Sequence, residues 1–310
     1  MEKKCNDKQI LNPKTNRCVK KNGLIAKKII INNELINLAW KNNSCYLDSL
    51  LVALFHNNNS FFLNDPLITY KDNNIMKYSS SIKNELEKIY LIISKRFLLK
   101  TKYNCSSLRK NMNDFYKKLI KFNPNINIIN KNENLTNSQL DVFEILTLYE
   151  YIFNIPNNLK FIEGTNINYS NFIFNIPIDL LINKNKVFIN KILPSFKIKN
   201  NNKIFKTTLL KTDKLFIKIY RNLDIFKLET KIIPCNILKL PENSFNLNLS
   251  SLIIHYGNNI GGHYICLYKS NNKWFEYDDT NDNITYIGSL SKIINNNNYT
   301  SNIVGIVYTK

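Results

Sequence analysis

Apolar residues recur at helical spacing in the first half of the chain and in short alternating runs in the second half. Over residues 44–56, leucines and a phenylalanine recur every three or four positions, which predicts a helix with one buried stripe. Similar spacing predicts helices over 81–99, 106–121 and 137–152. From about residue 158, Ile, Phe, Tyr and Val alternate with Asn or Lys, and strands are expected over 171–180, 187–193, 203–210, 214–220, 225–233, 249–256, 263–269, 273–278 and 303–309. Helices followed by strands indicate an α+β fold with an antiparallel sheet.

The length and composition of the chain limit its domain count and indicate its charge. The 310 residues suffice for one large domain or two modest ones, and 44% hydrophobic residues allow a substantial core. The formal net charge of +20 would favour a polyanion, an anionic membrane surface or an acidic protein. The lysines are spread along the chain, however, and no nucleic-acid-binding motif accompanies them. Nucleic-acid binding therefore stays an alternative that we do not favour.

Targeting signals are not evident. The first eight residues lack the apolar core of a signal peptide, and no window approaches eighteen uninterrupted apolar residues. We therefore expect no membrane span and a cytoplasmic location. Most of the six cysteines are scattered without pairing by spacing, which fits a reducing compartment.

Residues 1–24 form a separate segment. Cys5 and Cys18 flank a run of turn-forming residues and could close a short loop, hold a metal with help, or be free thiols. The pattern Cys…Leu-Asn-Pro-Lys-Thr-x-Arg-Cys resembles a viral two-cysteine adaptor module, which implies a viral protein without saying what the module binds. The alternative is a basic tail with two incidental cysteines.

Cys45 is the candidate nucleophile because it opens the predicted helix over 44–56, with Asn43 or Ser44 as the expected N-cap. Unpaired backbone N–H groups and the positive end of the helix dipole favour a thiolate there. The same N–H groups could hold the oxyanion of a tetrahedral intermediate. The alternative is a small buried residue of a helix.

His263 and Asp278 are the candidate base and orienting carboxylate. Gly261 and Gly262 allow close backbone approach before His263, which begins a predicted strand. A turn at 270–272 and a returning strand would bring Asp278 beside the imidazole, where a carboxylate can hold the ring and stabilise its cation. Asp279 is expected to face the other way, because strand residues alternate in direction.

Four stretches resemble the motifs of one enzyme family in its own order. Residues 43–49, Asn-Ser-Cys-Tyr-Leu-Asp-Ser, resemble the cysteine box of ubiquitin-specific proteases, closest to the cylindromatosis-type deubiquitinases. Residues 252–279 resemble the histidine box, the Gln-x-Asp-x-x-Glu-x-Leu run at 139–146 resembles a thumb-helix motif, and 172–177 resemble a following strand.

This resemblance implies a papain-like catalytic domain over 25–310. A helical thumb over about 40–155 would carry Cys45, and a sheet palm with fingers over about 156–310 would carry His263 and Asp278. The implied reaction is hydrolysis after the C-terminal glycine of ubiquitin without a cofactor, and the implied partners are ubiquitin or ubiquitinated proteins. His255 would be structural. By its position after an apolar helix face, His56 is expected to be a helix C-terminal cation. Oligomeric state is not indicated.

The chain also departs from the family pattern. Trp40 stands five positions before the cysteine, where the family commonly places an oxyanion-holding Asn, so Asn43, Asn42 or backbone N–H groups are the candidates instead. No Cys-x-x-Cys pair is present, so the fingers are expected to be short and metal-free. Trp40-Lys41-Asn42 resembles a branch that acts on SUMO. Alternatives are thus a protease for another ubiquitin-like modifier, a catalytically weak ubiquitin-binding module, and a structural or nucleic-acid-associated virion protein.

Overall fold

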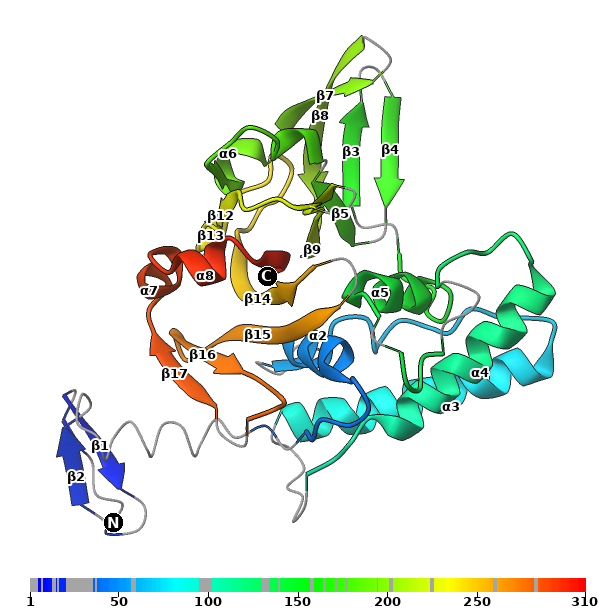
Figure 1. Ribbon diagram of the computed structural model, residues 1–310, viewed down its shortest axis with the longest axis horizontal. Helices are drawn as coiled ribbons and strands as arrows, with labels where there is room; N and C mark the ends of the chain where they lie inside the picture. Colours follow the sequence, from blue (N-terminus) through cyan, green and yellow to red (C-terminus); the bar gives the residue numbers. More distant parts are fainter. Residues whose placement is uncertain are drawn as a thin grey trace.

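The computed structural model describes most of the chain, and its gaps are short. The residues outside the description are 1–4, 7, 13–14, 16, 21–35, 37, 57–59, 95–101, 130–133, 139, 157–158, 164–165, 171, 177, 194, 201–202, 224–225, 259–260 and 282–283. After the N-terminal strands β1 (Gln9–Asn12) and β2 (Arg17–Lys20), four helices follow in the described part of the chain and pack beside a central sheet, and a second sheet lies on the far side of the central sheet from these helices (Figure 1). The α+β expectation is confirmed.

The four predicted helices are present with altered ends: α2 (Cys45–Phe55), α3 (Asn73–Ile93), α4 (Ser106–Phe122) and α5 (Val142–Glu150). Helix α3 begins eight residues before the predicted start, because Asp72 caps it and the hydroxyl of buried Ser79 bonds back to the Ile75 carbonyl. Helix α5 is shorter, since Asp141 and Glu144 form a capping box at its start. Among the helices described, none is long and apolar enough to cross a membrane.

The central sheet has eight strands in the order β17-β16-β15-β14-β18-β9-β5, with β13 also on β14. Its pairs are antiparallel except β5 with β9. The strands are β5 (Ile173–Ile176), β9 (Lys214–Ile219), β13 (Ile237–Leu238), β14 (Leu247–Gly257), β15 (Gly262–Ser270), β16 (Lys273–Tyr277), β17 (Thr285–Gly288) and β18 (Ile303–Thr309).

The second sheet has the order β4-β3-β8-β7 and is built from β3 (Leu159–Glu163), β4 (Asn166–Ser170), β7 (Ser195–Asn200) and β8 (Lys203–Lys211). Smaller pairs join β6 (Lys186–Phe188) to β12 (Lys231–Ile233) and β10 (Asn222–Leu223) to β11 (Phe226–Lys227). Short helices are η2 (Ile178–Leu180), α6 (Ile189–Ile192), α7 (Leu290–Ile294) and α8 (Asn297–Thr300). The strand predicted over 187–193 is therefore right only for residues 187–188, because the chain turns into α6 at Ile189.

The N-terminal segment contains a hairpin of β1 (Gln9–Asn12) and β2 (Arg17–Lys20). A disulfide joins Cys5 to Cys18, so the loop-closing alternative holds for this cysteine pair. Two four-residue strands are too small to be stable alone, and a covalent link compensates for the missing core.

Two of the three histidines are neutral packing residues. His56 Nδ1 donates to the Val52 carbonyl at 2.9 Å, and Nε2 lies 3.1 Å from the Ser250 hydroxyl. The ring of His255 stacks on Tyr264 with centroids 4.3 Å apart. Burial lowers the pKa of both histidines to about 4. The expectation that His56 is a cation is wrong, because its site is dry.

A buried arginine holds the segment before α2. Arg109 of α4 donates through Nε to the Leu135 carbonyl at 2.6 Å, and through Nη1 to the carbonyls of Lys41 and Asn42 at 3.0 and 2.7 Å. Its Nη2 lies 3.4 Å from the Ser138 carbonyl. One side chain on α4 therefore fixes the chain that leads into Cys45.

Replacing Arg109 with Met should lower the free energy of unfolding by about 2–4 kcal/mol, because several buried carbonyls lose their donor. Lys110→Met on the exposed side of the same helix is the matched control and should change stability little. Urea unfolding of both variants measures the difference. Equal midpoints would contradict the bracing role of Arg109.

The imidazole resonances of His56 and His255 should stay at their neutral positions down to about pH 5, since burial depresses both pKa values. An NMR titration measures this, and His56→Gln and His255→Gln assign the signals. A midpoint near the ordinary value of about 6.5 for either ring would show that it is solvated.

Candidate active site

Helix α2 is fastened to the start of β15 through one residue, Tyr264. The Ser49 hydroxyl donates to the Tyr264 carbonyl at 3.0 Å, across 215 residues of sequence. The backbone N–H groups of Tyr264 and Tyr46 both donate toward the thiol of Cys45. Pairing of β15 with β16 begins only at Cys266, so this stretch of β15 is open to the helix. The thiol thus lies beside the residue that follows His263.

Gly262, just before His263, packs too closely against its neighbours to carry a side chain. A Cβ atom there would lie 2.2 Å from the Tyr256 carbonyl oxygen and 2.4 Å from His255 Nε2, closer than any side chain tolerates. The expected close approach is therefore real, and both the Tyr256 carbonyl and the His255 ring cause it. The imidazole of His263 is 31% exposed, in contrast to the other two.

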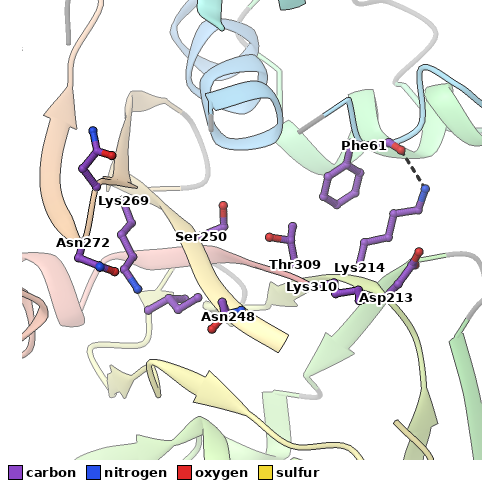
Figure 2. A pocket seen from close by; sticks show the side chains of 11 residues that line it. Phe61, Asp213, Lys214, Asn248, Ser250, Lys269, Asn272, Thr309 and Lys310 are labelled. Carbon is purple, nitrogen blue, oxygen red and sulfur yellow. Dashed lines mark hydrogen bonds between the residues drawn. The ribbon is translucent and has the colours of Figure 1, made fainter. Parts of the chain in front are cut away.

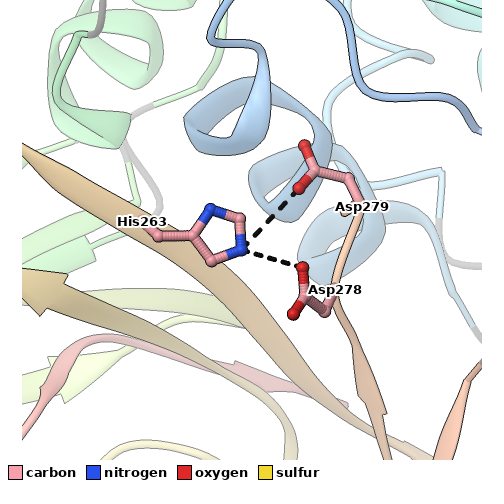
Figure 3. Close-up of side chains that lie close together, drawn as sticks. All are labelled: His263, Asp278 and Asp279. Atoms are coloured by element: carbon pink, nitrogen blue, oxygen red, sulfur yellow. Dashed lines mark hydrogen bonds and ion pairs between the residues drawn. The ribbon is translucent and has the colours of Figure 1, made fainter. Parts of the chain in front are cut away.

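The predicted hairpin brings Asp278 to His263. Strands β15 and β16 pair in register from Ser270↔Lys273 to Cys266↔Tyr277, and Asn271 and Asn272 make the turn with positive φ. Nε2 of His263 donates to Asp278 Oδ1 at 2.8 Å (Figure 3). The second ring nitrogen, Nδ1, points away from this carboxylate and is the atom left for proton transfer.

Asp278 is held ionised by its own loop. Partial burial raises its pKa, but hydrogen bonds outweigh this effect and the net pKa is lowered. The donors are the Thr280 backbone N–H and hydroxyl at 3.0 and 2.7 Å, and the His263 ring. The amide of Asn281 occupies the other carboxylate oxygen at 2.8 Å. The carboxylate is therefore fixed and charged, as ring orientation requires.

Asp279 does not face away, contrary to the expectation from strand alternation. Its Oδ1 lies 3.8 Å from the same Nε2 atom of His263, and its carboxyl group is fully buried (Figure 3). Strand β16 ends at Tyr277, so the alternation rule does not apply two residues later. Burial, followed by the charge of Asp48, raises the pKa of Asp279, so adjacent carboxyl groups have pKa values shifted in opposite directions.

The thiol of Cys45 is neutral at rest, which corrects the expectation of a lowered pKa. Cys45 is 3% exposed, and burial raises the pKa of its thiol to about 11. The two backbone N–H groups oppose this rise, whereas the charges of Asp279 and Asp48 add to it. Among the described interactions, no hydrogen bond joins the sulfur to the His263 ring.

The two candidates for holding the oxyanion, Asn42 and Asn43, lie in the segment before α2 and differ in their surroundings. Asn42 and Asn43 both have left-handed backbones, with φ of 51° and 60°. The Asn43 side-chain amide donates to the Asn137 carbonyl at 3.1 Å, so this donor is already in use. Asn42 is exposed, and Trp40 is 47% exposed close to the nucleophile. The oxyanion role of Asn42 and Asn43 stays a prediction.

Sequence reasoning missed Asp48, which lies one helical turn after Cys45. The Ser44 hydroxyl donates to Asp48 Oδ2 at 2.5 Å, so Ser44 occupies the predicted N-cap position without capping through its side chain. A carboxylate inside a fully buried helix was the available signal. Gln139 and Pro177 of the family-like motifs lie outside the described residues.

His263, Asp278 and Asp279 also form a potential metal-ligating group, with one ligand atom from each residue lying within 4.8 Å of the others. A metal would need the lone pair of Nε2, which here carries the proton donated to Asp278. We therefore assign the group to hydrogen bonding.

A separate hollow of about 720 Å³ lies on another part of the central sheet (Figure 2). Its lining includes Lys214, Lys269 and Lys310, and Lys214 Nζ donates to the Phe61 carbonyl at 3.0 Å. Neither Cys45 nor His263 lines it, so the candidate active site lies elsewhere.

Comparison with known proteins agrees with this geometry. The family model of ubiquitin carboxyl-terminal hydrolase matches residues 35–288, which include Cys45, His263 and Asp278. No curated protein matches the chain significantly. The match covers most of the chain, and the chain therefore belongs to the ubiquitin carboxyl-terminal hydrolase family of papain-like, cysteine-type hydrolases that act on ubiquitin or ubiquitinated proteins.

Proposed function

We propose that the chain is a deubiquitinase whose nucleophile, base and orienting carboxylate are Cys45, His263 and Asp278. The observation that carries this assignment is the hydrogen bond of 2.8 Å from His263 to Asp278, next to a strand residue whose N–H contacts the Cys45 thiol. The two other histidines are buried and engaged elsewhere, which leaves His263 as the base.

The reaction begins when Nδ1 of His263 accepts the thiol proton and sulfur attacks the carbonyl carbon of the last glycine of ubiquitin. The resulting imidazolium protonates the leaving lysine amine as the C–N bond breaks, and an acyl thioester remains on Cys45. Water then gives a proton to Nδ1 and attacks the thioester, which releases the ubiquitin carboxylate and restores the thiol. Asp278 stays ionised and stabilises the imidazolium throughout.

This cycle requires the ring and the sulfur to approach each other on substrate binding. Without substrate the thiol is neutral. Hydrogen bonds between catalytic groups commonly shorten only when substrate binds, and we expect this for the thiol and the imidazole here. The high thiol pKa also supports the alternative of a weak enzyme that mainly binds ubiquitin. Turnover measured beside ubiquitin affinity separates these two.

The identity of the modifier that the enzyme removes, and the viral source of the protein, are proposed from sequence resemblance. The exposed Trp40 and its two following residues support SUMO or another ubiquitin-like modifier as the second candidate substrate. The Cys5–Cys18 segment supports a viral source through its sequence pattern. Its disulfide weighs against the reducing compartment expected from the other cysteines, so a location in the host cytoplasm rests on the resemblance alone.

A ubiquitin probe with a C-terminal electrophile should form a covalent adduct with Cys45, and a SUMO probe tested in parallel should react more slowly. Cys45→Ala should abolish labelling. Cys235→Ser, a remote and partly buried cysteine, should keep it. A folded protein that reacts with neither probe would refute the hydrolase assignment. Faster reaction with the SUMO probe would show that SUMO, and not ubiquitin, is the preferred modifier.

Asp278→Asn should reduce kcat/KM for a fluorogenic ubiquitin substrate by about 10²–10⁴, because the imidazolium loses its fixed counter-charge. Asp213→Asn, an exposed and remote carboxyl, should have no effect. A reduction of less than about threefold for Asp278→Asn would transfer the orienting role to another group.

A further inference from the structure

Two buried carboxyl groups beside the candidate active site have more hydrogen-bond acceptors than nearby donors. Within the described residues, Asp48 Oδ1 and both oxygens of Asp279 are buried without a hydrogen-bond donor. Asp48 has no exposed surface, and neither has the Asp279 carboxyl. Ionised carboxylates can only accept hydrogen bonds, so two of them in a dry site leave each other unsatisfied, which is energetically costly.

These two groups come from opposite walls of the site and meet. Asp48 projects from α2, one turn after Cys45, and Asp279 follows β16 beside His263. Their side chains lie within hydrogen-bonding range of each other. A single proton would turn one oxygen into a donor and satisfy both groups at once, as carboxyl pairs in contact commonly do.

We propose that Asp48 and Asp279 share one proton, forming a carboxyl–carboxylate pair that fastens α2 to the segment after β16. The pair also removes one negative charge from the surroundings of the Cys45 thiol. It acts as a positioning pair and does not contact the reacting atoms. The effect on hydrolysis rests on the proposed function, whereas the shared proton itself does not.

The surroundings assign the proton to Asp279. Asp48 receives the Ser44 hydroxyl at 2.5 Å, which favours its charged form. Asp279 has no comparable donor, and burial and the charge of Asp48 both favour its neutral form. Several titratable and charged groups face the pair. They are Arg109 from α4, Cys105 just before α4, Cys45 and Tyr46 from α2, Tyr277 from β16, His263 from β15, and Asp278.

The shared proton has a consequence for the nucleophile. Cys45 must become an anion within reach of both carboxyl groups, and each negative charge opposes that step. With one proton held by the pair, the thiolate faces one charge where it would otherwise face two. Loss of the proton at alkaline pH restores the second charge and separates the two walls. Reactivity of Cys45 should then rise less steeply with pH than that of an ordinary thiol.

The direct experiment is a carbon-13 NMR titration of protein labelled at the aspartate carboxyl carbons. One resonance should titrate at least two units above the ordinary value of about 4, and Asp279→Asn should remove it. Asp48→Asn, which supplies a permanent amide donor, should move that midpoint back down. If every aspartate finishes titrating below about pH 5, the shared proton is refuted. This readout needs no activity, so it separates failure of this inference from failure of the proposed function.

A second experiment reads the charge at the nucleophile. Alkylation of Cys45 by iodoacetamide, followed on its own peptide by mass spectrometry, gives the pH profile of the thiol. Asp48→Asn combined with Asp279→Asn removes the charge of the pair and should lower the apparent thiol pKa by about one unit, which is about tenfold faster labelling at neutral pH. Either single variant leaves one negative charge and should label at close to the unmodified rate. Asp213→Asn is the control. An unchanged profile in the folded double variant would refute the electrostatic role.

The same variants give a stability signature with a defined sign. A carboxyl whose native pKa is raised stabilises the fold fully at acidic pH, and this contribution is lost as the pH rises through the raised value. The unfolding midpoint of the unmodified protein should therefore fall as the pH rises from about 4 to about 8, and Asp279→Asn should flatten that fall. Parallel curves for the two proteins would count against the pair.

Discussion

The docking of α2 on the open edge of β15 is the constraint on which the active site depends. Tyr264 accepts a hydrogen bond from Ser49 through its carbonyl, and its N–H faces the Cys45 thiol and favours the thiolate. Because these contacts use backbone atoms of a strand, their position is set by sheet register and not by a flexible side chain. A nucleophile and a base that are far apart in sequence thereby share one rigid junction, and Arg109 braces the chain that enters it.

Water exclusion at this junction determines its electrostatics. Burial raises the pKa values of Cys45, Asp48 and Asp279, while the hydrogen-bonded Asp278 beside them is shifted downward. Neighbouring carboxyl groups in opposite protonation states are a common way to build both a fixed charge and a proton store in one site. The helix dipole, which favoured a thiolate in the sequence, is too small to offset the loss of hydration at Cys45.

The sequence predicted the parts of the site that depend on local spacing. The helix opening at Cys45, the hairpin that carries Asp278 and the turn at 270–272 all follow from periodicity and turn chemistry. What it could not predict depends on contacts between distant segments. Asp279 turns toward His263 because β16 ends early, and Asp48 finds its partner across the groove. Strands β3, β4 and β7 were missed because lysines and asparagines obscure their alternation.

The N-terminal hairpin and the proposed nucleophile need opposite redox conditions. Cys45 could attack a substrate only as a reduced sulfur, whereas the Cys5–Cys18 bridge exists only when two sulfurs are oxidised. Dithiothreitol, the usual additive for thiol enzymes, would thus open the small hairpin while it protects catalysis. Any affinity that belongs to the closed hairpin would go undetected in such a buffer, so recognition by this segment and turnover by the enzyme are best measured in separate reagents.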